Sequence, residues 1–423
     1  MSSAPASTAR EDIERLPVGL VDAATGIIGR VACGGADGTP EGLPVCAVAA
    51  LRRSGACEVG FGKGLTGAEA TIGAIGEALE IYGGSSYSDA DLRREAFVRM
   101  GDGAMDPRLL CLYENSSYDR PGFPYARFEP ERPIHWTKGH WLDTGEPVWL
   151  PALTVFHYFP AAPAERFCQV TSNGSATGRG FADAAFRAVL ELVERDAFML
   201  TWYARVPATE VIVDEDLDPG LTAILNQIQA KAARPQFYML NAGIDIPTIL
   251  CCARGDGKNW PGATLGLGTH PSPRIALKKA ILEMGQTAHS LCRAMHSGEE
   301  PIPAKPSDVR TFRQHALYYL RADRAKEFDF LDAGKRAIRL SAVDEPGDFP
   351  LSTLLQRMSD AGTRVAVKDL TTPDLRTTPF SVVRALGTNL QQIHCGFGME
   401  RTNNARLRRL LRGRVNRAIP PFC

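Results

Sequence analysis

The chain has 423 residues, which is enough for two or three average domains or for one large domain. Its 48 basic residues balance its 48 acidic residues, and this balance argues against a nucleic-acid partner, which would need a basic excess. No apolar stretch reaches the length of a bilayer span, so we expect no membrane partner.

The N-terminal residues lack the basic segment and apolar run of a secretory signal, so we predict a cytoplasmic location. The ten cysteines include no C-x-x-C pair, which predicts reduced and mostly buried thiols, not disulfides or a zinc site. Residues 1–16 are expected to be disordered, and residues 17–423 to form one domain.

Strands are predicted at Val45–Ala50 and Cys57–Gly60, ahead of a glycine-rich turn. The turn matches the dinucleotide pattern G-x-G-x-x-G only formally, because the helix that follows is acidic where a pyrophosphate would lie. Lys63 in this turn could neutralise a phosphate or be an ordinary solvated lysine, and the residues alone leave both interpretations open.

Residues 85–130 are polar and irregular, and His135–Phe159 is typical of a hairpin around Thr144-Gly145. Further strands are predicted at Val211–Asp214, Gln236–Leu240, Thr248–Arg254, Ala263–Leu267, Arg364–Asp369 and Val382–Ala385. Helices are predicted at Leu221–Ala233 and Leu351–Asp360, with a partly helical insertion at 297–335. This alternation favours an α+β (α/β-like) fold, a single large domain with mixed and antiparallel sheets.

The central segment Thr171–Arg205 begins with the polar turn Ser172-Asn173-Gly174 and then has the periodicity of a long amphipathic helix. Glu191 and Glu194 are three residues apart, so they lie on one face of this helix, beyond two alanines. Like charges at this spacing repel each other, and a solvated face would normally carry interleaved lysines.

The pattern A-x-x-x-A-x-x-E-x-x-[EQ] occurs three times, each time after a turn that contains Gly or Pro. The further copies are Ala70, Ala74, Glu77 and Glu80, and Ala276, Ala280, Glu283 and Gln286. We expect the alanines to let the three helices approach closely, so that five carboxylates and one amide share a space. The alternative is three ordinary helices with surface Glu pairs; it would be favoured for a single pair, but the repetition argues against it.

A carboxylate cluster of this kind needs cations. Hard oxygen ligands without His or Cys suit Mg²⁺, which usually keeps several waters and is completed by substrate phosphates. The pattern therefore predicts a site for a nucleoside triphosphate with Mg²⁺.

These motifs carry a family resemblance. The segment SNG-x-A-x-G followed by E-x-x-E-R-D resembles the core motif of the YcaO family, and the upstream GKG…E-x-x-E and downstream E-x-x-Q are similar to its two other nucleotide motifs. The likeness runs from about Val18 to the C-terminus. It implies an ATP- and Mg²⁺-dependent enzyme that activates a backbone amide: a nucleophile adds to the carbonyl, ATP phosphorylates the oxyanion, and phosphate leaves.

The resemblance also implies roles for individual residues. It implies that the metal ligands are Glu77, Glu80, Glu191 and Glu194. It implies that the nucleotide is bound by Lys63, Glu77, Ser172, Asn173, Glu191, Arg195, Lys279, Glu283 and Gln286. Arg195 is a candidate catalytic residue because its guanidinium could bind a phosphate. The alternative is that Arg195 forms a salt bridge that closes the helix. Gly73, Ile81 and Lys279 depart from residues that the family often has.

The chain ends in a proline-containing tail, residues 418–423, which is partly similar to the tail that reaches the active site in azoline-forming members. If it docks there, Cys423 and its carboxylate are candidate catalytic groups; otherwise the tail is an inert end. The segments around 194–207 and 367–375 resemble members found with ribosomal peptide natural products.

The resemblance therefore favours an azoline-forming cyclodehydratase of the D-protein type, which makes thiazolines or oxazolines from Cys, Ser or Thr of a precursor peptide, as in antibiotic biosynthesis. Thioamide or macroamidine formation and a non-catalytic scaffold are the alternatives. The expected partners are the precursor peptide and a separate leader-peptide-binding protein that resembles ubiquitin-activating enzymes. A dehydrogenase is a further candidate partner, and a homodimer within a larger complex is expected.

Overall fold

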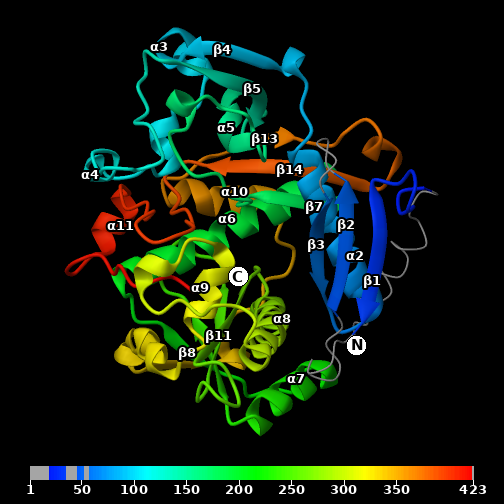
Figure 1. The fold of residues 1–423 in the computed structure, drawn as a ribbon, viewed down its shortest axis with the longest axis vertical. Coiled ribbons are helices and arrows are strands. Elements are labelled where there is room, and N and C mark those ends of the chain that lie inside the picture. Colours follow the sequence, from blue (N-terminus) through cyan, green and yellow to red (C-terminus); the bar gives the residue numbers. More distant parts are fainter. Residues whose placement is uncertain (1–18, 35–44, 52–56, 422–423) are drawn as a thin grey trace.

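The computed structural model describes residues 19–34, 45–51 and 57–421. The predicted disordered segment 1–16 and the candidate residue Cys423 lie outside this range. The described chain forms three β-sheets, and one long helix follows an edge strand of each (Figure 1). This mixed α+β arrangement confirms the predicted fold class.

The first sheet has the order β1-β2-β3 and is antiparallel. Its strands are β1 (Ile28–Gly34), β2 (Val45–Leu51) and β3 (Cys57–Lys63). Helix α2 (Gly67–Gly84) begins after Thr66, whose side chain accepts a hydrogen bond from the Glu69 amide and so caps the helix. The two strands predicted in this region are confirmed.

The second sheet has the order β4-β5-β13-β14-β7, with β6 paired to β5. Its strands are β4 (Leu92–Ala96), β5 (Pro133–Trp141), β6 (Pro147–Pro151), β7 (Ser175–Arg179), β13 (Val365–Asp369) and β14 (Phe380–Gly387). The β5–β6 hairpin turns at Thr144-Gly145, where Gly145 has φ +73°, as its sequence predicts. Helix α6 (Gly180–Ala204) packs on β7 and β14.

The third sheet has the order β11-β10-β9-β8-β12, in which β12 runs parallel to β8 and the other neighbours are antiparallel. Its strands are β8 (Thr209–Ile212), β9 (Arg234–Met239), β10 (Thr248–Arg254), β11 (Ala263–Thr269) and β12 (Arg336–Arg339). Helix α8 (Pro273–Ser297) packs on β11 and β10. The remaining α-helices are α3 (Phe97–Met100), α4 (Asn115–Tyr118), α5 (Ala152–Val155), α7 (Pro219–Ala230), α9 (Phe312–Tyr318), α10 (Leu351–Asp360) and α11 (Ala405–Leu410).

The three strand–helix units β3-α2, β7-α6 and β11-α8 share a close contact between a strand glycine and a helix alanine. A Cβ placed on Gly62 would lie 1.9 Å from the Ala70 carbonyl oxygen, and one on Gly268 would lie 2.0 Å from the Ala276 carbonyl oxygen. A Cβ placed on Gly178 would lie 2.3 Å from the Ala184 amide nitrogen. This corrects the expected role of the alanines: they bring each helix onto its own strand.

The three units also contact one another in a ring. Helix α2 packs on β7 of the second unit, α6 contacts β11 of the third, and α8 contacts β3 of the first. In Figure 1, α6 crosses the centre of the molecule, with α2 and α8 beside it. The motifs on the three helices are therefore brought together although they lie far apart in the sequence.

The segment 297–335 contributes to the core that surrounds the C-terminal half of α6. Tyr319, Phe328 and Leu331 are buried in one cluster with Trp202 and Tyr203 of α6. This segment contains α9 and a 3₁₀ stretch, Ala322–Gly334. It is thus partly helical, as predicted, and forms part of the hydrophobic core.

The tail docks against the same core as far as Pro421. The Trp202 indole Nε1 donates to the Ala418 carbonyl at 3.0 Å, and the Tyr319 hydroxyl donates to the Ile419 carbonyl. The His315 Nδ1 lies 2.7 Å from the Pro420 carbonyl oxygen, and Ile419 is 1% exposed. Three consecutive backbone carbonyls are therefore held by buried side chains.

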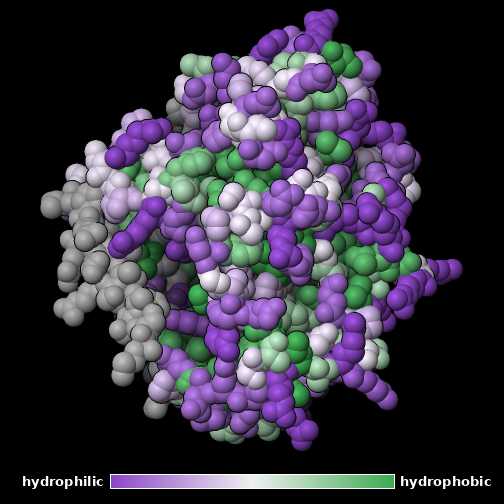
Figure 2. Space-filling model, turned by 180° about the vertical axis from the view of Figure 1, so that it is seen from behind, coloured by the Kyte–Doolittle hydropathy of each residue, from purple (hydrophilic) through white to green (hydrophobic). Residues whose placement is uncertain are grey.

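Figure 2 shows hydrophilic side chains over much of this face, with smaller hydrophobic patches between them. In the part of the chain that the structure describes, no helix combines the length and the apolarity that a bilayer crossing requires.

Candidate functional site

The carboxylates of the three repeated motifs meet where the three units contact one another. The Lys63 ammonium lies 3.2 Å from Glu283 Oε2 and joins β3 to α8 across 220 residues of sequence. The Thr177 amide donates to Glu80 Oε1 at 2.8 Å and joins β7 to α2. These contacts connect the first unit to the third and to the second, whereas a common metal and nucleotide site for Glu77, Glu191 and Glu283 stays a prediction.

Backbone amides orient three of the glutamates. Glu77 Oε2 accepts from the Phe61 amide at 2.8 Å, and Glu191 Oε2 accepts from the Gly174 amide at 3.1 Å. Together with the bond to Glu80, each of these contacts uses one carboxylate oxygen. Because a carboxylate offers about four acceptor positions, most of the capacity of each group is left for a cation.

Burial and mutual repulsion disfavour the charged form of this cluster. Burial raises the pKa of Glu80 well above its ordinary value, and the charges of Glu191 and Glu77 raise it further. Burial also raises the pKa of Glu191 to about 7; Arg195 opposes this shift and Glu194 adds to it. The positive charge around these carboxylates is therefore too small to stabilise their ionised form. A bound divalent cation would supply that charge and lower their pKa values.

The opposite side of the site is basic. Burial alone would raise the pKa of Glu283, but Lys63, Arg195 and Lys279 together hold it below its ordinary value. Burial alone would lower the pKa of Arg195, but Glu194, Glu283 and Glu191 raise it, so the guanidinium stays charged. The Arg195 Nε is buried without a hydrogen-bond acceptor, which fits a group that awaits a phosphate oxygen.

The other predicted residues occupy different positions around the site. Ser172 is exposed, whereas Asn173 is 3% exposed and its Oδ1 lacks a hydrogen-bond partner. The Lys279 ammonium donates to the Thr269 carbonyl at 3.1 Å, at the end of β11. Gln286 is half-buried, one turn after Glu283. Cys423 lies outside the described residues, so its catalytic role stays a prediction.

The donor set fits Mg²⁺ that is completed by phosphates. Over residues 19–34, 45–51 and 57–421, no group of three or more His, Cys, Asp or Glu side chains is placed to hold a metal ion. One or two carboxylates per ion, with the remaining ligands from water and phosphate, is the usual coordination of Mg²⁺ at nucleotide sites. Glu77, Glu80, Glu191 and Glu194 would supply these carboxylates.

Two contributors were not found from the sequence. The amide of Thr177 orients Glu80, and a backbone donor has no sequence signal. Arg384 supports the Thr171–Gly174 turn by donating to the Thr171 carbonyl at 2.7 Å. The signal for Arg384 was a single charge inside the apolar strand sequence SVVRAL.

A pH dependence follows from the raised pKa of Glu191. The folded value of about 7 lies above the ordinary 4.5, so the metal-free protein is stabilised below pH 4.5 and loses this contribution as the pH rises through 7. Because the side chain is 25% exposed, the loss is at most about 3 kcal/mol. We expect urea unfolding in EDTA to show lower stability at pH 8 than at pH 5.5, and Mg²⁺ with a non-hydrolysable ATP analogue to reverse the difference. An equal stability at both pH values would contradict this assignment.

The sequence profile of the family described as YcaO cyclodehydratase, ATP- and Mg²⁺-binding, matches residues 61–390. The chain belongs to the YcaO family. This confirms the predicted family, and the ATP- and Mg²⁺-binding that describes the family agrees with the predicted cofactors ATP and Mg²⁺. The matched range contains all three carboxylate motifs.

Two curated proteins resemble this YcaO chain. An uncharacterized protein of Methanothermobacter thermautotrophicus is 29% identical over 249 residues, 58% of this chain and 61% of the relative. An uncharacterized protein in the tfuA 3′ region of Rhizobium leguminosarum bv. trifolii is 28% identical over 179 residues, 38% of this chain and 41% of the relative. The chain thus matches less than two thirds of the length of either relative.

Solved structures share the fold of this YcaO chain. A heterocyclase in complex with substrate and cofactor has a TM-score of 0.76 at 20% identity, over 92% of this chain and 52% of the neighbour. YcaO from Methanopyrus kandleri, bound with AMPPCP and Mg²⁺, has a TM-score of 0.66 at 21% identity, over 92% of each chain. The Escherichia coli microcin synthetase McbBCD complex has a TM-score of 0.61 at 14% identity, over 84% of this chain and 86% of the neighbour.

Proposed function

We propose that this YcaO chain activates backbone amides of a ribosomally made precursor peptide with ATP and Mg²⁺, and so converts Cys, Ser or Thr residues to thiazolines or oxazolines. The observation that carries the proposal is the meeting of carboxylates from α2, α6 and α8 with Lys63 and Arg195. An amide oxygen is a poor leaving group, and its loss as phosphate makes the ring closure favourable.

The proposed roles divide between the two sides of the site. Glu77, Glu80, Glu191 and Glu194 would hold Mg²⁺, which supplies charge neutralisation and orientation of the phosphates. Lys63 and Arg195 would bind phosphate oxygens directly, because both lie against Glu283 and can exchange that contact for a phosphate. Asn173, held by the turn that also orients Glu191, would contact the nucleotide.

The proposed partners are the precursor peptide and a separate protein that binds its leader and delivers it. The solved neighbours include the McbBCD complex with pro-MccB17 bound, which supports a peptide substrate and a multi-subunit assembly. A homodimer, a dehydrogenase partner and a role in antibiotic biosynthesis belong to the same proposal. The reaction consumes ATP, so we place it in the cytoplasm.

Co-expression of this chain with its cognate peptide and partner, followed by mass spectrometry, tests the proposal. Azoline formation makes the peptide lighter by one water for each ring. A thioamide product would instead be heavier, because sulfur replaces oxygen. A macroamidine would also lose one water but would consume the N-terminal amine of the peptide, which fragmentation reveals.

The non-catalytic alternative is tested in the same system with Glu191→Gln and Glu194→Gln. If the peptide is still modified at the wild-type rate in the assembled complex, the chain acts as a scaffold and the proposed catalysis is wrong. If modification stops while the complex still assembles, catalysis resides in this chain.

A further inference from the structure

Arg384 is a buried cation inside an apolar strand. It is 3% exposed, and its neighbours Val383 and Ala385 in β14 are fully buried. In the part of the chain that the structure describes, the acceptors of its hydrogen bonds are all neutral. Another buried arginine, Arg406, is paired with Asp196 at 2.7 Å, so the fold supplies a counter-ion for that charge. Burying a charge without a counter-ion is costly, which indicates that Arg384 has a role that an apolar residue could not fill.

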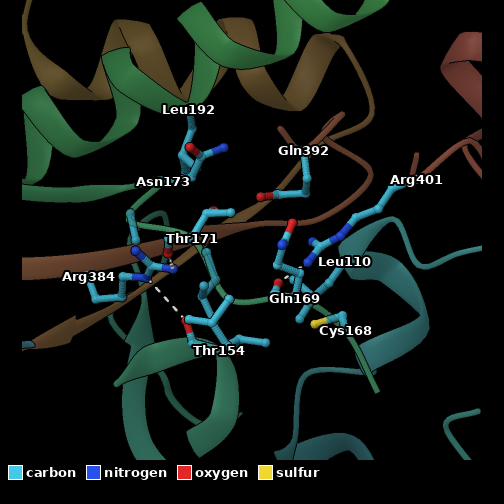
Figure 3. A pocket seen from close by; sticks show the side chains of 13 residues that line it. Leu110, Thr154, Cys168, Gln169, Thr171, Asn173, Leu192, Arg384, Gln392 and Arg401 are labelled. Atoms are coloured by element: carbon cyan, nitrogen blue, oxygen red, sulfur yellow. Dashed lines mark hydrogen bonds between the residues drawn. The ribbon is translucent and has the colours of Figure 1, made fainter. Parts of the chain in front are cut away.

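The three hydrogen bonds of Arg384 hold both ends of the turn that precedes β7. One terminal nitrogen donates to the Thr171 carbonyl at 2.7 Å, at the start of the turn, and the other donates to the Ser175 hydroxyl at 2.9 Å, at its end. The Nε donates to the Thr154 carbonyl of the short helix α5 at 3.1 Å. Figure 3 shows the Arg384 side chain pointing toward Thr171 and Thr154. Because a guanidinium is planar and its donors are fixed, it sets the distances between these three acceptors.

The backbone of the turn is held from the same strand. The amide of Ala385, the residue after Arg384, donates to the Gly174 carbonyl at 2.7 Å. Gly174 has φ +80°, and a Cβ there would lie 2.3 Å from the Ala385 carbonyl oxygen, so the turn lies directly against β14. The Gly174 amide donates to Glu191 Oε2 at 3.1 Å. A shift of the turn would therefore move the bond that orients this carboxylate of the candidate site.

Ser175 connects this arrangement to α2 through His157. The His157 Nε2 lies 3.2 Å from the Ser175 Oγ, and the His157 amide donates to the Gly84 carbonyl at 2.7 Å, at the end of α2. Burial, together with the charge of Arg384, lowers the pKa of His157 to about 3, so the neutral ring can accept the hydrogen of the Ser175 hydroxyl. Helix α2 carries two of the four predicted metal ligands. The hydroxyl that Arg384 holds thus links the turn to this helix.

We propose that Arg384 is a positioning residue of the nucleotide site. By holding both ends of the turn, it fixes the place of Asn173 and of the Gly174 amide that orients Glu191. Arg384 itself touches neither the nucleotide nor the metal. The inference rests on the proposed function, because it takes this turn and Glu191 as parts of the site for ATP and Mg²⁺.

The test compares Arg384→Lys with wild type in the full-length protein. Lysine keeps the positive charge, but its single ammonium group cannot hold both Thr171 and Ser175 in the geometry of the guanidinium. Calorimetry with Mg²⁺ and a non-hydrolysable ATP analogue is expected to give about tenfold weaker binding for the variant. Arg376→Lys, at a side chain that is 64% exposed, is the matched control and should keep the wild-type affinity. Unchanged affinity in Arg384→Lys would overturn the proposal.

Steady-state kinetics of peptide modification separate positioning from a loss of folded protein. A displaced turn weakens the binding of ATP in the ground state and in the transition state alike. The KM for ATP should therefore rise about tenfold, while kcat changes by less than about threefold. A purely structural role would instead lower the concentration of active enzyme, so kcat would fall at an unchanged KM, and this result would refute positioning.

Ser175→Ala removes only the hydroxyl and tests the same contact if Arg384→Lys does not fold. It is expected to weaken binding of the Mg²⁺-bound analogue about fivefold. The double variant should bind about tenfold more weakly than wild type, because both substitutions break one contact; an additive loss of about fiftyfold would contradict the inference. Wild-type affinity in Ser175→Ala would contradict it as well.

The outcomes for the two proposals are distinct. A wild-type protein that binds the analogue but modifies no peptide would refute the proposed function alone. A protein that modifies the peptide, and whose Arg384→Lys and Ser175→Ala variants bind the analogue as wild type does, would refute this inference alone.

Discussion

Replacing Glu191 with glutamine is expected to lower the rate of ATP-dependent peptide modification by about 10²–10³-fold, the usual effect of removing one preorganised contact to a reacting phosphate or its metal. Glu191 accepts a hydrogen bond from the Gly174 amide and lies 3.9 Å from the Arg195 guanidinium. Its charge also repels that of Glu80. Glutamine keeps the oxygen that accepts the Gly174 N–H but removes the charge. The variant should therefore fold and still fail to hold Mg²⁺ with the nucleotide.

Melting curves separate the chemical effect of this substitution from a loss of folding. With EDTA at pH 8, Glu191→Gln should be at least as stable as wild type, because it removes a repelling charge whose pKa is about 7. Mg²⁺ with a non-hydrolysable ATP analogue should stabilise wild type more than the variant. Glu210→Gln, at an exposed position in β8, is the matched control and should behave as wild type. A variant that modifies the peptide as fast as wild type would remove Glu191 from the proposed metal ligands.

The site was predictable from the sequence where side chains repeat in a pattern, and hidden where the backbone contributes. The spacing of Glu77, Glu191 and Glu283 after pairs of alanines indicated a shared site, and the contact of Lys63 with Glu283 supports it. The Thr177 amide that orients Glu80 could not be found, because every residue except proline carries such a donor.

The fold was predictable where periodicity is strong. The bounds of Thr248–Arg254 and Leu351–Asp360 agree with the structure, because a buried apolar strand and an amphipathic helix each have a distinct period. Strand β7 was missed, since Ser175–Arg179 is rich in small residues and contains no run of β-branched or aromatic side chains. The order of strands depends on contacts between distant segments, which no local pattern records.

The glycines opposite the helix alanines show how the fold supports the site. Replacing Gly268 with alanine would place a Cβ 2.0 Å from the Ala276 carbonyl oxygen and 2.8 Å from the Ala280 amide nitrogen, both of which are backbone atoms. Neither atom can rotate away, so α8 must move off β11. We expect a loss of about 3 kcal/mol of unfolding free energy, measured in urea. Gly347→Ala, where a Cβ meets nothing within 4 Å, is the control and should stay within about 0.5 kcal/mol of wild type.

The same substitution should also weaken the proposed nucleotide site, because α8 carries Glu283, and Glu283 holds Lys63 at 3.2 Å. Moving the helix separates this pair and shifts Lys279, whose Cβ lies 2.8 Å from the position of the added methyl group. At a temperature where Gly268→Ala is still folded, its affinity for Mg²⁺ with a non-hydrolysable ATP analogue should fall about tenfold by calorimetry. If the stability falls but the nucleotide affinity is unchanged, the prediction is wrong. The close packing of α8 on β11 then stabilises the core, and nucleotide binding does not depend on the position of α8 relative to β11.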